Sequence, residues 1–173
     1  MKIKQESMLH TGQNKYDYID CYEFILDDPN NRISITDVGE CFIAPGPQWM
    51  EWLMALRNSI VSVLGLKTSI LEQSGNRWEI GSQAGMFKVF SKTTHEIILG
   101  DDDKHLDFRV SLLLEPDKQY KRVAVTTTVK YHNWLGRCYF FFVKPIHRLI
   151  VPLTLKPKFK RLAEESIQKL SLK

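Results

Sequence analysis

Cysteine is scarce in this sequence of 173 residues. Cys21, Cys41 and Cys138 are far apart, and none of them forms a CxxC pair. This spacing argues against the common zinc and dithiol redox sites, and it is typical of a protein kept in a reducing compartment. The chain also lacks an uncharged apolar run of about 18 residues and an apolar stretch of signal-peptide type near its start. We therefore expect a cytoplasmic protein that is not integral to a membrane.

Motifs that bind nucleotides, metals or acyl groups are missing as well. No GxGxxG follows a predicted strand, no GxSxG occurs, and residues 81–85 lack the lysine of a phosphate-binding loop. The five histidines include no HxH, HxxxH or HExxH spacing, and His132 and His147 are 15 positions apart. The sequence therefore predicts no metal site and no cofactor.

Hydrophobic residues make up 43% of the chain and charged residues 25%, which are the proportions of a packed globular protein. The length suits a single domain. We expect a flexible N-terminal segment at residues 1–15, a folded domain at residues 16–156 and a basic C-terminal tail at residues 157–173.

Charge is distributed unevenly along the chain, although the net charge is only +4. Residues 1–117 contain 11 Lys or Arg and 18 Asp or Glu, whereas residues 118–163 contain 11 Lys or Arg and no acidic residue. Dispersed basic residues of this kind usually form the solvated sides of amphipathic elements, and only residues 156–161 are locally dense. We expect no specific nucleic-acid binding, and at most a weak contact with anionic surfaces.

The spacing of apolar residues predicts an α+β protein. Alternation along the chain indicates strands, and apolar spacings of three and four residues indicate helices. Ser34 and Asp37 have the spacing of a helix-capping pair, and Asn133 can cap the last helix. Pro145 should bend that helix or open it near Phe141. We expect strands at residues 16–26, 77–82, 86–92, 95–99, 105–115 and 120–131, and helices at residues 35–43, 48–65 and 133–156.

The last predicted helix is the most apolar one, with a stripe that begins at Leu135. A curved antiparallel sheet packed against such a helix can leave a space in which a small apolar molecule binds. In the first strand, Asp20 alternates in phase with Tyr18 and Phe24, so all three side chains are expected on the same side of the sheet.

Several linked segments resemble a bacterial family known as domain of unknown function 2867. They are WMEWLMALRNSIVSVLGLKTS at residues 49–69, the strand pair HLDFRVSLLLE and RVAVTTTVKYHNWLGRCYF, and the ending VKPIHRLIVPLTLK. The resemblance extends over roughly residues 16–156. That family is similar to the START-like superfamily, whose helix-grip fold is shared by birch-pollen allergens, lipid-transfer START domains and polyketide cyclases. The resemblance implies a curved antiparallel sheet around a long C-terminal helix and a hydrophobic ligand between them, but no known reaction.

The candidate ligand-binding residues on helices are Trp49, Trp52, Tyr139 and Phe142. They occupy apolar positions, where they are either ordinary core residues or part of a cavity wall.

The polar candidates are Arg109, His132 and His147. Arg109 shares a strand face with Asp107, and the natural assignment turns that face toward solvent. If the face pointed inward instead, Arg109 would be a buried charge able to bind a ligand carboxylate or phosphate. His132 more plausibly closes its strand, whereas His147 can lie at the mouth of a cavity. No residue is assigned as catalytic.

Three functions remain open from the sequence. The leading one is a START-like protein that binds a small apolar or amphipathic molecule. The second is an enzyme of cyclase or related type that uses His147, His132 or Arg109 in the same cavity. The third is an interaction module whose basic C-terminal half binds an anionic partner.

Overall fold

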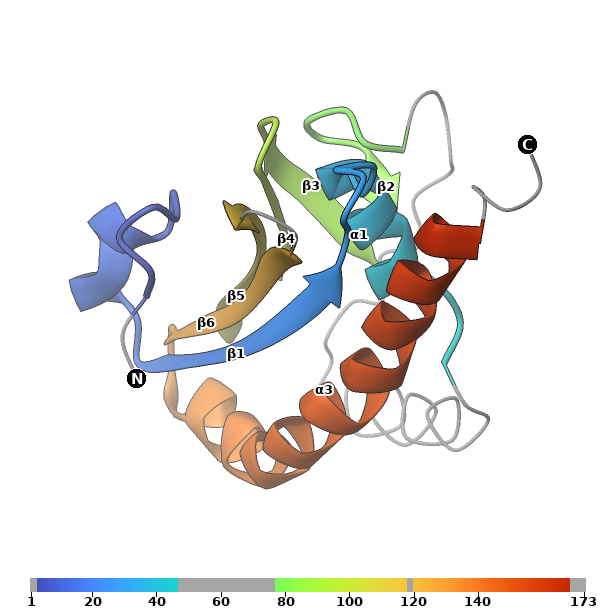
Figure 1. Ribbon diagram of the computed structural model, residues 1–173. Coiled ribbons are helices and arrows are strands. Elements are labelled where there is room, and N and C mark those ends of the chain that lie inside the picture. Colours follow the sequence, from blue (N-terminus) through green and yellow to red (C-terminus); the bar gives the residue numbers. More distant parts are fainter. Residues whose placement is uncertain (1–2, 47–76, 118–119, 169–173) are drawn as a thin grey trace.

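The computed structural model describes residues 3–46, 77–117 and 120–168. Its central element is an antiparallel sheet of six strands in the order β1-β6-β5-β4-β3-β2, shown in Figure 1. A short 3₁₀ helix, η1, precedes the first strand, and α1 follows it. The elements are η1 (His10–Lys15), β1 (Tyr18–Asp27), α1 (Ile35–Ile43), β2 (Gln83–Ala84), β3 (Phe87–Lys92), β4 (Glu96–Asp102), β5 (Leu106–Asp117), β6 (Tyr120–Tyr131) and α3 (Trp134–Gln168).

The helices α1 and α3 pack on one face of the curved sheet. Figure 1 shows α3 running past that face and curving along its length. This arrangement confirms the α+β, helix-grip-like fold predicted from the sequence, with a curved antiparallel sheet and a long C-terminal helix.

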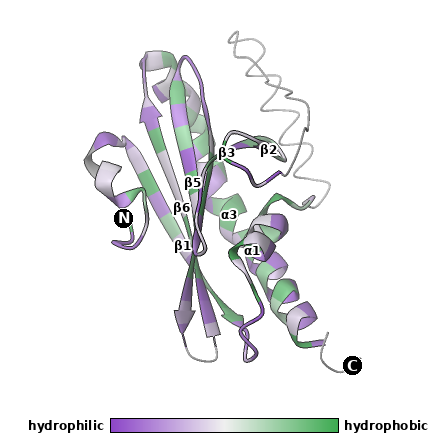
Figure 2. Ribbon diagram, turned by 90° about the horizontal axis from the view of Figure 1, so that it is seen from above, coloured by the Kyte–Doolittle hydropathy of each residue, from purple (hydrophilic) through white to green (hydrophobic). Residues whose placement is uncertain are grey.

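Alternation along the strands builds the main hydrophobic core. The inward positions of β5 and β6 are held by Val110, Leu112, Val123 and Val125, all buried. Figure 2 shows hydrophobic and hydrophilic residues in alternating bands along these strands. The core is completed by Val38 of α1 and by residues of α3, so each helix buries its apolar side against the same sheet face.

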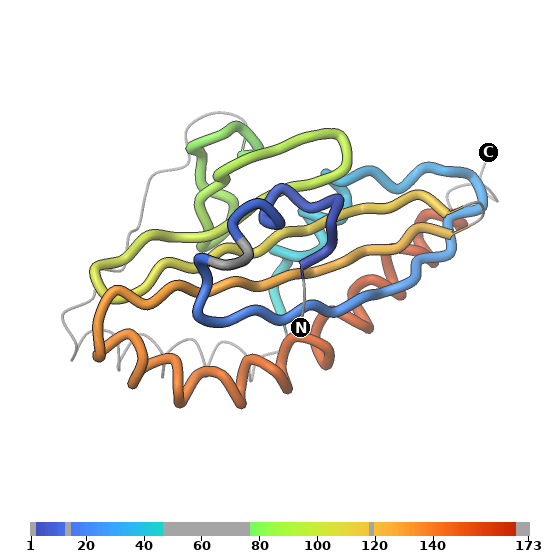
Figure 3. Tube along the Cα trace, turned by 90° about the vertical axis from the view of Figure 1, so that its left-hand side faces the viewer, coloured from blue at the N-terminus to red at the C-terminus, as the bar shows by residue number. Residues whose placement is uncertain are grey.

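The opposite face of the sheet is partly covered by the N-terminal segment, as Figure 3 shows. Ile3 and Leu9 are buried there with Ile98 of β4. The buried carboxylate of Glu96 accepts hydrogen bonds from the Ser7 hydroxyl at 2.6 Å and from the Met8 backbone N–H at 2.8 Å. These contacts attach residues 3–15 to the sheet. The proposed division at residues 15 and 156 stays a prediction.

Local signals in the sequence correctly located α1. Ser34 and Asp37 form a reciprocal capping box, in which each side chain accepts a hydrogen bond from the other residue's backbone N–H. The strand predicted at residues 77–82 is wrong, because that segment forms turns. Gly81 has φ +92°, and the Ser82 hydroxyl donates to the carbonyl groups of Arg77 and Glu79, so the backbone there is not extended. The helix predicted at residues 48–65 lies outside the described residues.

Helix α3 begins where the sequence predicted, but it ends at Gln168, 12 residues beyond the predicted end at residue 156. Asn133 caps it, since the Asn133 Oδ1 atom accepts a hydrogen bond from the Gly136 N–H at 3.1 Å. Gly136 is required there, because a Cβ atom would lie 2.1 Å from the His105 carbonyl oxygen. The helix continues through Pro145, Pro152 and Pro157 without opening, and Figure 1 shows that it is curved, so of the bend and the local opening expected from Pro145 the structure has a bend.

Candidate functional site

A buried carboxylate lies where α3 crosses β1. Asp20 is only 1% exposed, and it faces α3 because it alternates in phase with Tyr18 and Leu26, both of which are core residues. A buried carboxylate is costly unless it is paired or hydrogen-bonded, so the groups around Asp20 determine its state.

Four side chains surround Asp20, and we call the five residues the helix–sheet cluster: Tyr18, Asp20, Thr127, His147 and Arg148. The Tyr18 hydroxyl donates to Asp20 Oδ2 at 2.7 Å. The Nδ1 atom of His147, on α3, lies 3.1 Å from the same oxygen. Arg148 Nε donates to the Tyr18 hydroxyl at 3.3 Å. The cluster thus links β1 to the middle of α3 through polar groups.

The hydrogen-bond pattern fixes the orientation of the His147 ring. An ionised carboxylate only accepts hydrogen bonds, so Nδ1 must carry the proton that lies toward Asp20. The other ring nitrogen, Nε2, lies 3.5 Å from the Thr127 hydroxyl on β6. This order of carboxylate, imidazole and hydroxyl leaves Nε2 as the site that can take up a proton, which is the arrangement of a general base.

The environment keeps Asp20 charged. Burial alone would raise the pKa of the Asp20 carboxyl group, but the hydrogen bonds from His147 and Tyr18, with the nearby Thr127 hydroxyl, outweigh it and lower the pKa below its ordinary value. Burial and the hydrogen bond to Asp20 raise the pKa of the Tyr18 phenol, so Tyr18 stays protonated and remains a donor.

One oxygen of the cluster, Asp20 Oδ1, lacks a well-formed hydrogen bond among the described residues, although the Thr127 hydroxyl lies near the carboxylate. Asp20 Oδ1 is buried and accepts no hydrogen bond of normal geometry within the part of the chain that the structure describes. Buried polar atoms are nearly always paired, so a carboxylate oxygen without a well-formed hydrogen bond is an unusual feature of the helix-facing side of the sheet.

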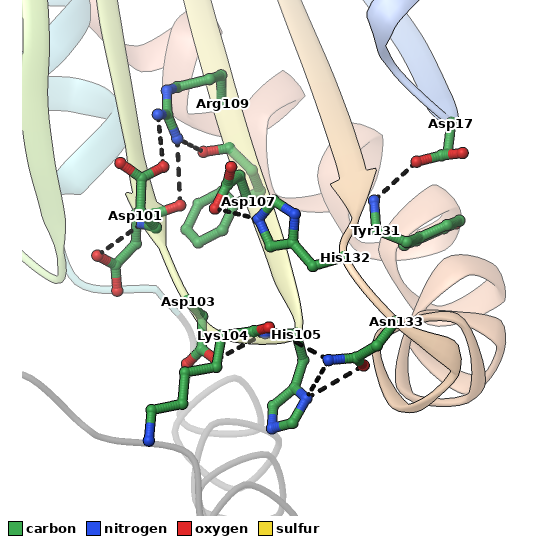
Figure 4. Close-up of polar contacts among 12 residues, drawn as sticks. Asp17, Asp101, Asp103, Lys104, His105, Asp107, Arg109, Tyr131, His132 and Asn133 are labelled. Atoms are coloured by element: carbon green, nitrogen blue, oxygen red, sulfur yellow. Dashed lines mark hydrogen bonds and ion pairs between the residues drawn. The ribbon is translucent and has the colours of Figure 1, made fainter.

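One of the polar candidates from the sequence, His132, lies in a different place, at the end of the sheet. Figure 4 shows His132 Nε2 beside Asp107 Oδ1, at 2.9 Å, and His105 beside the Asn133 amide. These contacts join the β4–β5 end of the sheet to the start of α3. Both His132 and Asp107 are partly exposed.

Arg109 lies on the sheet face opposite to α3, as the natural assignment predicted. Its neighbours Phe108 and Val110 point into the core, so Arg109 points away from it. Its guanidinium group contacts Asp102 at 2.5 Å and stacks on the Phe90 ring, with 3.6 Å from Cζ to the ring centroid. The inward-facing alternative for Arg109 is therefore wrong, and the structure does not bring Arg109 together with His147.

The aromatic candidates on α3 have different surroundings. Tyr139 is half-buried and packs against the small core formed by Tyr18, Leu106, Val129 and Phe140. Phe142 is 68% exposed. Trp49 and Trp52 lie outside the described residues. Of the seven candidates, His147 and Tyr139 are the two that the structure places against groups around Tyr18.

The sequence interpretation missed the role of Asp20. Its signal was present, because a carboxylate that alternates in phase with Tyr18 and Phe24 must be buried with them and therefore needs a partner. The partner, His147, is 127 positions away, and no local spacing connects the two. Within residues 3–46, 77–117 and 120–168, no three His, Cys, Asp or Glu side chains are grouped as metal ligands would be.

Comparison with known proteins gives one finding. The profile of a family described as "Protein of unknown function (DUF2867)" matches residues 13–154, which is most of the chain and includes α1, the whole sheet and α3 up to residue 154. No curated protein and no solved structure matches the chain significantly. The matched segment contains every residue of the helix–sheet cluster, and the chain belongs to the DUF2867 family.

Proposed function

We propose that this protein binds a small hydrophobic or amphipathic molecule between the sheet and α3, in the manner of START-like proteins. The observation that carries the proposal is the buried, charged Asp20 carboxylate, whose Oδ1 atom has no well-formed hydrogen bond among the described residues. A ligand with an apolar body and one hydroxyl or amine group would satisfy that oxygen and bury its remaining surface against the surrounding apolar side chains.

Apolar contacts for such a ligand exist on the same face of the sheet. Phe140 packs against Tyr18 of the cluster, with 4.8 Å between the two ring centroids. Farther across the face, Phe42, Phe87 and Phe108 form a row of half-buried rings, with centroids 5.7 and 6.0 Å apart. Aromatic rings that are not fully buried by the core are suited to contact a hydrophobic guest.

The ligand proposal is tested with two probes that differ only in a hydrogen-bond donor, decan-1-ol and its methyl ether. The unchanged protein is expected to bind the alcohol about ten-fold more tightly than the ether, because a hydrogen bond to a charged, buried carboxylate contributes roughly 1.5 kcal/mol or more. Asp20→Asn should remove most of this preference. Displacement of a fluorescent apolar dye measures both affinities, and native mass spectrometry of gently purified protein detects any molecule that is already bound.

The matched control for this experiment is Asp107→Asn, which changes the carboxylate of the other histidine pair. That variant should keep the preference for the alcohol. If neither probe binds saturably to the folded protein, or if both variants change the preference equally, the proposed binding site is wrong.

A second candidate function is an enzyme in which His147 acts as a general base. The order Asp20, His147, Thr127 supports it, because the carboxylate holds the imidazole with Nε2 free to accept a proton. If the protein hydrolyses a simple ester such as p-nitrophenyl butyrate, His147→Ala should reduce kcat/KM by about 100-fold or more. His132→Ala, which removes the other carboxylate-paired histidine, should leave turnover unchanged. Equal rates for the protein and both variants would exclude this role.

A further inference from the structure

The outward side of α3 carries a continuous apolar surface. Its members are exposed and recur at spacings of three and four residues, which places them on one side of the helix. Five of its large hydrophobic side chains are more than half exposed: Trp134 at 69%, Phe141 at 73%, Phe142 at 68%, Leu149 at 63% and Leu153 at 59%. We call this surface the apolar helix face, and it consists of Trp134, Cys138, Phe141, Phe142, Pro145, Ile146, Leu149 and Leu153.

The opposite side of the same helix is fixed to the protein. Phe140 is buried against Tyr18, His147 contacts Asp20, and Leu155 lies in the main core. The apolar helix face therefore points away from the sheet, and the fold itself gives it no partner among the described elements. Exposed apolar patches of this extent mark interaction surfaces.

By length and composition α3 could cross a membrane, and only 17% of its most apolar 18-residue window is buried in the protein. Crossing would require the helix to leave the sheet and break the contacts of His147 and Arg148 with β1. A position flat on a bilayer keeps those contacts and buries the apolar helix face.

The charged residues beside the apolar helix face indicate what kind of partner it can bind. Arg137, Arg148 and Lys156 are exposed beside it, and residues 118–163 contain no Asp or Glu. Glu164 and Glu165 enter only near the end of the helix, where they pair with Lys160 and Arg161. A second copy of the chain would bring an equally basic surface against this one, and the like charges would repel. An anionic surface has the required complementary charge.

We propose that α3 binds the surface of an anionic phospholipid bilayer, with the apolar helix face inserted among the lipids and the exposed Arg137 and Lys156 at the headgroups. Aromatic and aliphatic residues such as Trp134, Phe141 and Leu149 are the types that enter the boundary between headgroups and acyl chains. This inference does not depend on the proposed ligand site, since it concerns the other side of the helix.

Co-sedimentation of the full chain with vesicles tests the proposal. The protein should bind vesicles of phosphatidylcholine that contain about 30% phosphatidylglycerol, and it should bind pure phosphatidylcholine far more weakly. Raising the salt concentration to about 0.5 M should weaken the binding, since the basic residues are exposed and their attraction is screened. The double variant Phe141→Glu with Leu149→Glu should lose on the order of ten-fold or more in affinity, because it removes apolar contacts and adds like charge.

A matched control uses Ile25→Glu with Ile80→Glu, two apolar residues that are 72% and 69% exposed outside α3. This variant should bind vesicles as the unchanged protein does, and circular dichroism confirms that both variants are folded. Absence of binding to anionic vesicles at low salt would overturn the proposal. A dimer in solution that only the Phe141 and Leu149 variant dissociates would also overturn it, because the apolar helix face would then be the contact between two copies.

Discussion

Replacing Phe159 by alanine is expected to lower the free energy of unfolding by about 3–5 kcal/mol, the range for large-to-small changes in a closed core. Phe159 is 2% exposed, and its ring packs edge-on against Phe24 of β1, with 5.1 Å between centroids. Its neighbours on α3, Leu155 and Ala163, belong to the same core. Removing the ring leaves a cavity where α1, α3 and the sheet meet. Urea unfolding followed by circular dichroism measures the change.

The control is Phe141→Ala in the same helix, where the ring is 73% exposed. That substitution should change the free energy of unfolding by less than about 0.5 kcal/mol, as exposed positions generally do. If Phe159→Ala does not fold, Phe159→Leu should give a smaller loss that can be measured. Equal effects at positions 141 and 159 would show that residues beyond 156 are a tail and do not complete the core.

Replacing Asp28 by alanine is expected to cost about 3–5 kcal/mol, because it leaves a buried ammonium group without its counter-charge. Asp28 is 2% exposed and lies 2.9 Å from Lys121 Nζ. It also accepts hydrogen bonds from the backbone N–H groups of Arg32 and Ile33, both at 2.9 Å. Lys121 donates in turn to the Ile33 carbonyl group. One carboxylate therefore joins the loop before α1 to the start of β6. The neighbouring Asp27→Ala, at an exposed position, is the matched control and should be nearly neutral.

The same pair should give stability a dependence on pH. Burial would raise the pKa of the Asp28 carboxyl group, but the backbone hydrogen bonds from Arg32 and Ile33 and the charge of Lys121 lower it below its ordinary value. A group with a lowered folded pKa contributes stability above its unfolded pKa, about 3.9 for Asp, and that stability is lost as the pH falls through the folded pKa. Unfolding measured between about pH 6 and pH 3 should show this acid loss, and Asp28→Asn should have a flatter profile. Identical slopes would contradict it.

Much of the fold could be predicted because its signals are local. The alternation in residues 120–131 requires a strand with two different faces, and the Ser34 and Asp37 pair requires a helix start at that point. The end of α3 was missed for a different reason. In the sequence, Pro157 indicates the end of a helix. The helix continues because Phe159 is buried against α1 and β1, and that burial cannot be seen from the local sequence.

The site was predictable only in part. His147 was singled out from the sequence. Its contacts with Asp20 and Thr127 could not be predicted, because these two residues come from two strands that are distant in the sequence. Arg109 illustrates the converse case. Strand alternation alone correctly placed it with Asp107 on the outer face. There its guanidinium group stacks on the Phe90 ring and forms an ion pair with Asp102.

The pairing of β1 with β6 has a consequence for synthesis on the ribosome. Tyr18 lies opposite Val129 and Asp27 lies opposite Tyr120, so paired residues of the two strands are 93 to 111 positions apart and the first strand is synthesised long before its neighbour. Until then its aromatic side chains and unpaired backbone groups are open to chaperones or to other nascent chains. Folding of the completed chain is correspondingly governed by long-range closure, which is intrinsically slow.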